Sequence, residues 1–331
     1  MPPPATRARL AADEAPALEV GTKKQRIGVE HQAEMEYASS CCIPTTWKEY
    51  ILIGVTPYNH DCSIFEFGLE PGQSLNLPVC GCILMATAGV QKEEVRPYTP
   101  ISDNSMLGKF QLLIKRYPAW GDPSFACNYK PPGTMSNYIH GLSVGSAVRF
   151  KHIPANVKKQ YPFTGIKTIT MLAVGVGIAP MLQALECLLT TEGDTTQIVF
   201  LYGNRTVEDI LMRERLDAWA ATHRHRFKMV YVVGTRWRDA IIGIRTSNPI
   251  LPQPPKGLQG LNNGITTGVE GWINEEHVKA FAFPPGEDTH VFVCGLPSVY
   301  DSLCGPRTEA ALAPMSVLAR LGYSQQMVFK F

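Results

Sequence analysis

The chain has 331 residues. Because single domains usually span roughly 100–200 residues, this length predicts two domains. Apolar residues make up 45% of the sequence and charged residues 18%, which is typical of a globular protein. The formal net charge of +2 is too small to create a field that gathers nucleic acid, so nonspecific nucleic-acid binding is excluded.

Nine cysteines are spread through the chain, and they form neither an even disulfide framework nor the paired C-x-x-C arrangement that binds zinc. The C-x4-C-x2-C spacing of plant-type iron–sulfur clusters is also missing. We therefore expect a reducing compartment, no metal site and no fused ferredoxin module. No stretch approaches the roughly 20 consecutive apolar residues that span a bilayer, so no transmembrane segment is expected.

The first part of the chain predicts an arm followed by a barrel. Residues 1–44 mix basic and acidic side chains, which fits a flexible arm. Residues 45–160 contain short apolar runs separated by Gly and Pro, which predict a small antiparallel barrel with one helix after Gly133. The runs expected to be strands are 50–55, 63–67, 81–86, 110–116 and 147–151.

The second part, residues 161–331, alternates buried strands with helical stretches, which is typical of βαβ units on a parallel sheet. The expected elements are strands 168–174, 198–202, 228–233 and 291–294 and helices 180–189 and 207–221. Between Gly234 and Gly271 the chain is rich in Gly, Pro and Asn and lacks periodicity, which predicts a long loop that is either functional or mobile.

Arg96-Pro97-Tyr98-Thr99-Pro100 is a first candidate binding segment. The Arg side chain can make charge-assisted bonds to a phosphate, the Tyr ring can lie along a flavin, and the Thr hydroxyl can bond the edge of its ring. Taken alone, the segment also fits a strand end stiffened by proline.

Glycine-rich turns provide two further candidates. Gly175-Val176-Gly177 leads from a predicted strand into a helix with Pro180 in its first turn, where backbone N–H groups can approach a phosphate; a plain tight turn is the alternative. The run from Gly133 to Ser136 offers a similar cradle before its own helix.

Cys294 ends a predicted parallel strand, where α/β folds bind their ligands, although most cysteines in such strands are simply packed.

The order of these motifs resembles the cytochrome-b5 reductase branch of the ferredoxin–NADP+ reductase family over about residues 47–331. Arg96-Pro-Tyr-Thr is similar to its R-P-Y-T/S motif, the run Gly133-Thr134-Met135-Ser136 to G-K-M-S, and the run Gly175–Pro180 to G-x-G-I-[TA]-P. Asn204 and the run Glu208–Leu216 resemble N-x-x-x-x-D-I-L-x-R-x-x-L, and Cys294-Gly-Leu-Pro297 stands for C-G-P-P.

The resemblance implies a two-domain, ferredoxin reductase-like fold, in which an antiparallel β-barrel FAD-binding domain (45–160) precedes an α/β Rossmann-like nucleotide-binding domain (161–331). It implies a reductase in which NADH, or NADPH, passes a hydride to FAD and single electrons then reach cytochrome b5 or another small heme protein. Residues implied to hold FAD are Arg96, Pro97, Tyr98, Thr99, Leu113, Lys115, Tyr117, Gly133, Thr134, Met135 and Ser136. Residues implied to face the nicotinamide nucleotide are Gly175, Val176, Gly177, Pro180, Met181, Cys294, Gly295 and Pro297. Thr99 and Cys294 are the implied catalytic residues.

Several positions depart from the family pattern. Val176 replaces a Thr that would touch the flavin, Thr134 replaces a Lys, and Leu296 replaces a Pro. Gly234 stands where the family has an acid for the adenosine ribose, and Arg236 and Arg238 follow, which favours tolerance of a 2′-phosphate unless the alignment has slipped. We expect NADH as the donor.

Other interpretations stay open. A degenerate flavin- or nucleotide-binding sensor or scaffold would account for the departures, and a quinone or a ferric chelate are alternative acceptors. Lys92, Lys115, Arg116 and Lys130 are expected to steer an acidic partner. We expect a monomer in the cytosol, with the cytosolic face of a membrane as the alternative.

Overall fold

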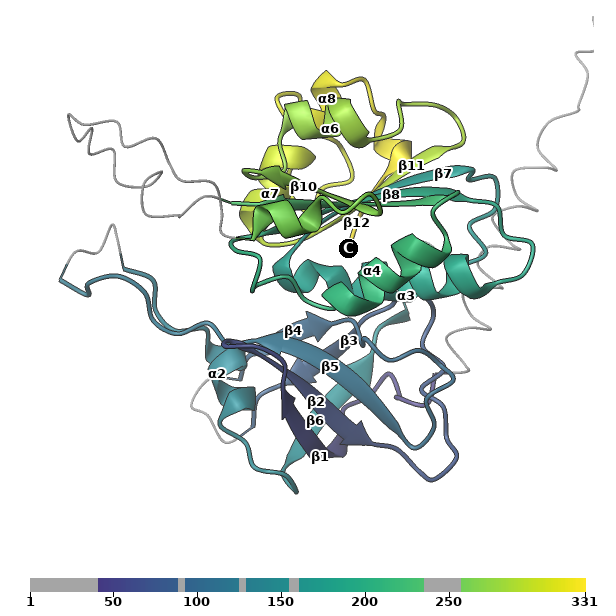
Figure 1. Cartoon of the computed structure of the whole chain (residues 1–331). Coiled ribbons are helices and arrows are strands. Elements are labelled where there is room, and N and C mark those ends of the chain that lie inside the picture. Colours follow the sequence, from purple (N-terminus) through teal and green to yellow (C-terminus); the bar gives the residue numbers. More distant parts are fainter. Residues whose placement is uncertain (1–40, 89–92, 125–128, 155–160, 235–256) are drawn as a thin grey trace, which may run out of the picture.

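The computed structural model describes residues 41–88, 93–124, 129–154, 161–234 and 257–331. It contains two six-stranded sheets, one built from the first half of the chain and one from the second (Figure 1). The predicted boundary between the two parts, at residues 160/161, adjoins the segment 155–160, which lies outside the described residues, and so do residues 1–40 of the predicted arm 1–44. None of the described helices is long and apolar enough to cross a bilayer.

The first sheet is antiparallel and has the strand order β4-β3-β6-β1-β2-β5. Its strands are β1 (Lys48–Pro57), β2 (Cys62–Gly68), β3 (Ile83–Ala86), β4 (Val95–Tyr98), β5 (Lys109–Lys115) and β6 (Ala147–His152). The edge strands β4 and β5 are joined by the chain that follows β4, because Ile101 N–H donates to the Gln111 carbonyl at 2.9 Å and Gln111 N–H donates to Ser102 Oγ at 3.0 Å. The predicted antiparallel barrel is therefore confirmed.

Aromatic rings fill the interior of this barrel. Phe67, Phe110 and Phe150 are fully buried and contact one another, with centroids 4.7 Å apart for Phe67 and Phe150. Large rings in mutual edge contact bury much apolar area and fix the approach of neighbouring strands. The short helix α2 (Thr134–His140) packs on this core through Met135 and Ile139.

The second sheet is parallel and has the strand order β10-β9-β8-β7-β11-β12. Its strands are β7 (Thr168–Val174), β8 (Gln197–Asn204), β9 (Phe227–Val233), β10 (Thr266–Glu270), β11 (Thr289–Cys294) and β12 (Val328–Lys330). Helices α3 (Ile178–Thr190) and α4 (Arg213–Thr222) cover the face toward the barrel; α6 (Glu275–Phe281), α7 (Pro297–Leu303) and α8 (Val317–Arg320) cover the other (Figure 1). The predicted α/β architecture is confirmed.

The strand order reverses between β7 and β11. From β7 the chain runs through β8, β9 and β10 on one side, and it then returns to place β11 and β12 on the other side. In open α/β sheets the loops at such a switch point diverge beyond the carboxyl ends of the strands and leave room for a ligand. The topology therefore places a ligand site at the ends of β7 and β11.

Two predictions about elements were wrong. The helix expected over 207–221 begins only at Arg213, because Met212 has a φ of +55°, which an α-helix cannot contain, and Asp209 is held in a turn by Thr206. The stretch 234–271 is not a loop throughout, since η3 (Leu258–Leu261) and β10 lie within it. Residues 235–256 lie outside the described part of the chain.

No disulfide bond joins any two of the eight cysteines in the described segments, and Cys127 lies outside them.

A buried guanidinium caps the end of α3, the helix that follows the switch point. Arg226 is 8% exposed and donates to the carbonyls of Leu188 and Leu189 at 2.9 and 3.2 Å, with Asp194 at 3.7 Å. The last carbonyls of a helix have no partner within it, so these two bonds satisfy acceptors that would otherwise be buried unpaired.

Replacing Arg226 with Met should lower the free energy of unfolding by about 2–3 kcal/mol, because two buried carbonyls lose their donor and Asp194 loses its ion-pair partner. Urea unfolding measures the difference. Arg224→Met is the matched control, since Arg224 is exposed and makes one long bond of 3.4 Å; its effect should stay within about 0.5 kcal/mol. Equal effects of the two substitutions would contradict the capping role.

Candidate active site

The glycine run that the sequence predicts to bind a nucleotide forms the turn η2 (Gly175–Gly177) between β7 and α3. Gly175 has a φ of +56°, a conformation that side-chain-bearing residues rarely adopt. A Cβ on Gly177 would lie 2.4 Å from the carbonyl oxygen of Cys294, so the two loops at the switch point touch through bare backbone. The positive φ thus favours glycine at position 175, and the close approach of the two loops requires glycine at position 177.

Cys294 is the last residue of β11 and is followed by Gly295 and by Pro297 at the start of α7. Burial raises the pKa of the Cys294 thiol to about 11, although a hydrogen bond with Tyr300 acts in the opposite direction. The thiol is therefore neutral at physiological pH, and it suits a packing wall better than a nucleophile. The Tyr300 pKa is also raised by burial.

The predicted flavin segment lies on the edge strand β4. Arg96 is 55% exposed and pairs with Glu94 at 2.6 Å. Tyr98 and Thr99 are partly exposed. Burial is the main cause that raises the pKa of Tyr98, and the neighbouring Tyr117 raises it further. Burial also raises the pKa of Tyr117, to about 12. Two neutral phenols, one at the end of β4 and one in the segment after β5, therefore lie near each other where the barrel closes.

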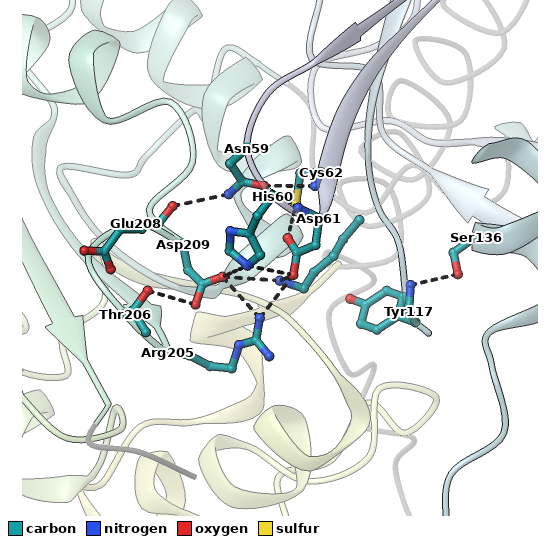
Figure 2. A network of polar contacts seen from close by, with 11 residues as sticks. Asn59, His60, Asp61, Cys62, Tyr117, Ser136, Arg205, Thr206, Glu208 and Asp209 are labelled. Carbon is teal, nitrogen blue, oxygen red and sulfur yellow. Dashed lines mark hydrogen bonds and ion pairs between the residues drawn. The ribbon is translucent and has the colours of Figure 1, made fainter. Parts of the chain in front are cut away.

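Ser136 holds the Gly133 turn against the segment after β5. Its hydroxyl accepts from Tyr117 N–H at 3.2 Å (Figure 2). It donates to the Gly133 carbonyl at 3.1 Å. A Cβ on Gly133 would lie 2.7 Å from Ser136 Oγ, so glycine is required there. Thr134 at the start of α2 is exposed. The predicted Gly133–Ser136 motif is thus packed beside Tyr117.

Other predicted site residues are core residues in this structure. Pro180 and Met181 are buried in α3, Leu113 is 4% exposed in β5, and Met135 is 4% exposed in α2. Val176 is partly exposed and packs against the apolar cluster that joins α3 to the barrel. These residues are therefore part of the packing on which the predicted binding loops rest.

Sequence reasoning missed a charged network that joins the barrel to the second sheet (Figure 2). Lys115 Nζ lies 2.5 Å from Asp61 and 3.5 Å from Asp209, and Arg205 lies 3.1 and 3.2 Å from the same two carboxylates. Asn59 of the barrel adds a bond to the Glu208 carbonyl at 3.3 Å. Lys115, expected to hold FAD and to steer a partner, is thus committed to two carboxylates.

His60, Asp61 and Asp209 lie close enough for one ion, with ligand atoms within 4.8 Å of one another. The ammonium of Lys115 already sits between the two carboxylates, and Arg205 supplies a second positive charge. We therefore assign these side chains to an ion-pair network.

The residues fit a flavin placed between the two parts of the chain. Strand β4 offers the exposed guanidinium of Arg96 and the ring of Tyr98, and Thr99, which follows the strand, offers a hydroxyl. These are the groups that bind a phosphate and an aromatic ring system. The glycine turn η2 contacts β5 of the same barrel, so the switch point opens beside this surface. A nucleotide at the switch point would therefore meet a flavin on the barrel.

Comparison with known proteins agrees with this geometry. Residues 49–156 match the model of the oxidoreductase FAD-binding domain, and residues 171–244 match that of the oxidoreductase NAD-binding domain. An NADH-cytochrome b5 reductase-like protein of Arabidopsis thaliana is 31% identical over 303 residues, which cover 87% of this chain and 77% of that protein. The chain belongs to the NADH-cytochrome b5 reductase family.

Further relatives of this reductase agree. NADH-cytochrome b5 reductase 2 of Botryotinia fuckeliana is 32% identical over 291 residues, covering 85% of this chain and 71% of that protein. The cytochrome b5 reductase domain of Ulva prolifera nitrate reductase has a TM-score of 0.67 and 27% identity, and the match covers 87% of this chain and 98% of that domain. The protein is therefore an oxidoreductase that uses FAD and NAD as cofactors.

In this reductase, Gly177→Ala should disturb the contact between the two switch-point loops. The added Cβ would meet the Cys294 carbonyl at 2.4 Å, and one loop must move. We expect a loss of about 1–3 kcal/mol in the free energy of unfolding, measured with urea, and weaker NADH binding, measured by titration. The control is Gly260→Ala, because a Cβ there meets nothing within 4 Å. Wild-type NADH affinity in the Gly177→Ala variant would refute the expectation that this contact positions the nucleotide.

Acid should weaken the charged network through Asp61. Burial raises the pKa of this carboxyl, but hydrogen bonds from Lys115 and the Cys62 thiol, together with the positive charge of Lys115, outweigh it and hold the pKa below the ordinary value of 3.8. Its stabilising effect is therefore complete above pH 3.8 and is lost as the pH falls through the lower folded value. We expect Asp61→Asn to cost about 1–3 kcal/mol at neutral pH, with the gap to wild type closing in that acid range.

Urea unfolding across this pH range measures the gap, which is the difference in the free energy of unfolding between wild type and the variant. The control for Asp61→Asn is Asp288→Asn, whose carboxylate pairs with Lys167 on the open surface and should give a smaller gap. A gap for Asp61→Asn that does not change with pH would mean that its ionised form contributes nothing.

Proposed function

We propose that this reductase takes a hydride from NADH onto FAD and passes single electrons to cytochrome b5 or a similar small heme protein. The observation that carries the proposal is the contact between the glycine turn η2 and the barrel strand β5. It brings a nucleotide loop and a flavin surface into one junction, which direct hydride transfer requires because the reacting atoms must approach to about 3–3.5 Å.

Each motif has a proposed task on the flavin side. The Arg96 guanidinium would leave Glu94 for the FAD pyrophosphate, Tyr98 would lie along the ring system, and Thr99 would donate its hydroxyl to the ring edge. The turn Gly133–Ser136 would hold the phosphate end beside Tyr117. When bound, FAD supplies the capacity to accept two electrons together and to release them one at a time.

On the nucleotide side, Gly175 and Gly177 would let the dinucleotide approach the backbone of η2. The neutral Cys294 thiol would pack against the nicotinamide, with Gly295 and Pro297 shaping the same wall. These groups orient the donor and exclude water, and none of them needs to lose a proton.

We propose NADH as the preferred donor. The position where the family has an acid for the adenosine ribose does not support this choice: Gly234 follows β9, and the ring of Trp272 lies 3.1 Å from where a Cβ on it would stand. Arg236 and Arg238, which would favour a 2′-phosphate, lie outside the described residues. The two curated relatives described above are both named for NADH, and their names support the assignment.

The proposed acceptor rests on the same names and on exposed positive charge. Arg116 and Lys130 are exposed on the barrel, whereas Lys92 lies outside the described residues and Lys115 is bound to Asp61. Such charges would raise the rate of encounter with an acidic heme protein. We propose a monomer that works in the cytosol or at the cytosolic face of a membrane.

An anaerobic titration of the FAD-loaded protein with NADH, and separately with NADPH, tests the donor. We expect NADH to bleach the flavin absorbance at a higher rate than NADPH. Steady-state turnover then compares cytochrome b5 with a quinone and a ferric chelate, and cytochrome b5 should be reduced fastest, at a rate that falls with salt. If neither nucleotide reduces the bound FAD, the proposal of a reductase fails in favour of a sensor. If a quinone or a ferric chelate is reduced faster than cytochrome b5, the proposed acceptor is wrong.

A further inference from the structure

Gln183 is a buried amide at the junction of the two sheets. It lies in the second turn of α3 and is 8% exposed, between Leu182 at 1% and Ala184 at 0%. A primary amide in such surroundings is costly unless both its donor and its acceptor are satisfied. Its partners therefore show what the side chain does.

Both partners belong to the barrel. Gln183 Oε1 accepts from the backbone N–H of Cys80 at 2.7 Å, and Gln183 Nε2 donates to the carbonyl of Pro100 at 2.7 Å. The Cys80 thiol donates in return to the Pro180 carbonyl of α3 at 3.2 Å. One helix of the nucleotide part is thus bonded to two separate backbone segments of the flavin barrel.

The positions of these bonds matter for the reaction. Pro100 follows Thr99 directly, and α3 follows the glycine turn that ends at Gly177. A displacement of the Pro100 carbonyl would move Thr99, and a displacement of α3 would move the turn. Gln183 therefore connects the backbone of the two loops that carry the proposed flavin and nicotinamide contacts.

We propose that Gln183 is a positioning residue that sets the distance between flavin and nicotinamide by fixing the Thr99 loop to α3. The inference rests on the proposed flavin site. It assigns to a neutral, buried amide a task that the charged network at Lys115 cannot perform alone, because the Arg205 guanidinium of that network is 49% exposed and its pairing weakens with salt. Two bonds of 2.7 Å in an apolar core are not screened in this way.

Gln183→Met tests the proposal, because it keeps the volume of the side chain and removes both bonds. Stopped-flow reduction by NADH gives the limiting rate and the nucleotide dissociation constant separately. We expect the limiting rate to fall about 10- to 100-fold, since displacements of about 1 Å have effects of this size, while the NADH dissociation constant, the FAD content and the flavin reduction potential stay at wild-type values.

The matched control is Glu186→Gln on the same helix, whose carboxylate pairs with Arg215 of α4. Its limiting rate should equal that of wild type. A Gln183→Met protein that is less stable but reaches the wild-type limiting rate would overturn the proposal, because the amide would then serve folding alone. Wild-type protein that NADH does not reduce would instead overturn the proposed function.

Gln183→Glu provides a second variant that keeps the acceptor for Cys80. Ionised, the carboxylate cannot donate to the Pro100 carbonyl; protonated, it can. Cys80, Cys187 and Cys294 have pKa values raised by burial, so these thiols stay neutral throughout. We expect the limiting rate of this variant to recover as the pH falls from about 9 to about 6, relative to wild type. A ratio to wild type that is equal to one at every pH would also overturn the proposal.

Discussion

The packing of α3 against the barrel is the contact on which the remaining structure depends. Four buried barrel residues, Cys62, Cys80, Ile101 and Leu113, belong to the same apolar cluster as the residues of α3 and α4. The hydrophobic effect acts on this cluster as on a single core, so the two sheets are held by the force that holds each of them internally. The hydrogen bonds of Gln183 lie inside the cluster and give it a definite register.

The junction between the two sheets contains both charged and neutral contacts, in different places. The network of Lys115, Asp61, Asp209 and Arg205 reaches solvent through the Arg205 guanidinium, which is 49% exposed, so the pairing of Arg205 depends on ionic strength. The amide of Gln183 lies in the apolar part, where ionic strength does not act on it. Solution conditions therefore act on the ion pairs of this network, whereas the contact that Gln183 makes between the Thr99 loop and α3 stays constant.

The sequence predicted the architecture because its strongest patterns are local. The antiparallel runs, the βαβ alternation, Arg96–Thr99 and Gly175–Gly177 each depend on neighbouring residues, and the structure has both folds where they were expected. The junction was missed because its bonds connect residues far apart in the chain, such as Gln183 and Cys80, which are 103 positions apart. Within the sequence, Gln183 is one polar residue in an apolar helix.

The wrong helix start near Asp209 has the same origin. Val207, Ile210 and Leu211 follow a helical spacing, but the turn before Arg213 presents Asp209 to Lys115 of the barrel, and this partner lies on a strand of the other sheet. The strand β10 was missed because its sequence, with Gly268 at its centre, is a weak strand by itself and gains its order from pairing with β9.

The shared core at α3 also limits how the molecule can be divided. The two parts carry separate binding motifs and separate sheets, as modular proteins do, yet Cys80 and Leu113 of the barrel would face water if α3 were absent. A barrel produced alone would expose an apolar patch and the unbonded N–H of Cys80, a surface that promotes aggregation. Evolution or engineering can therefore exchange the donor half of this reductase for another only if the new half brings a helix with the same apolar face and an amide at the same position.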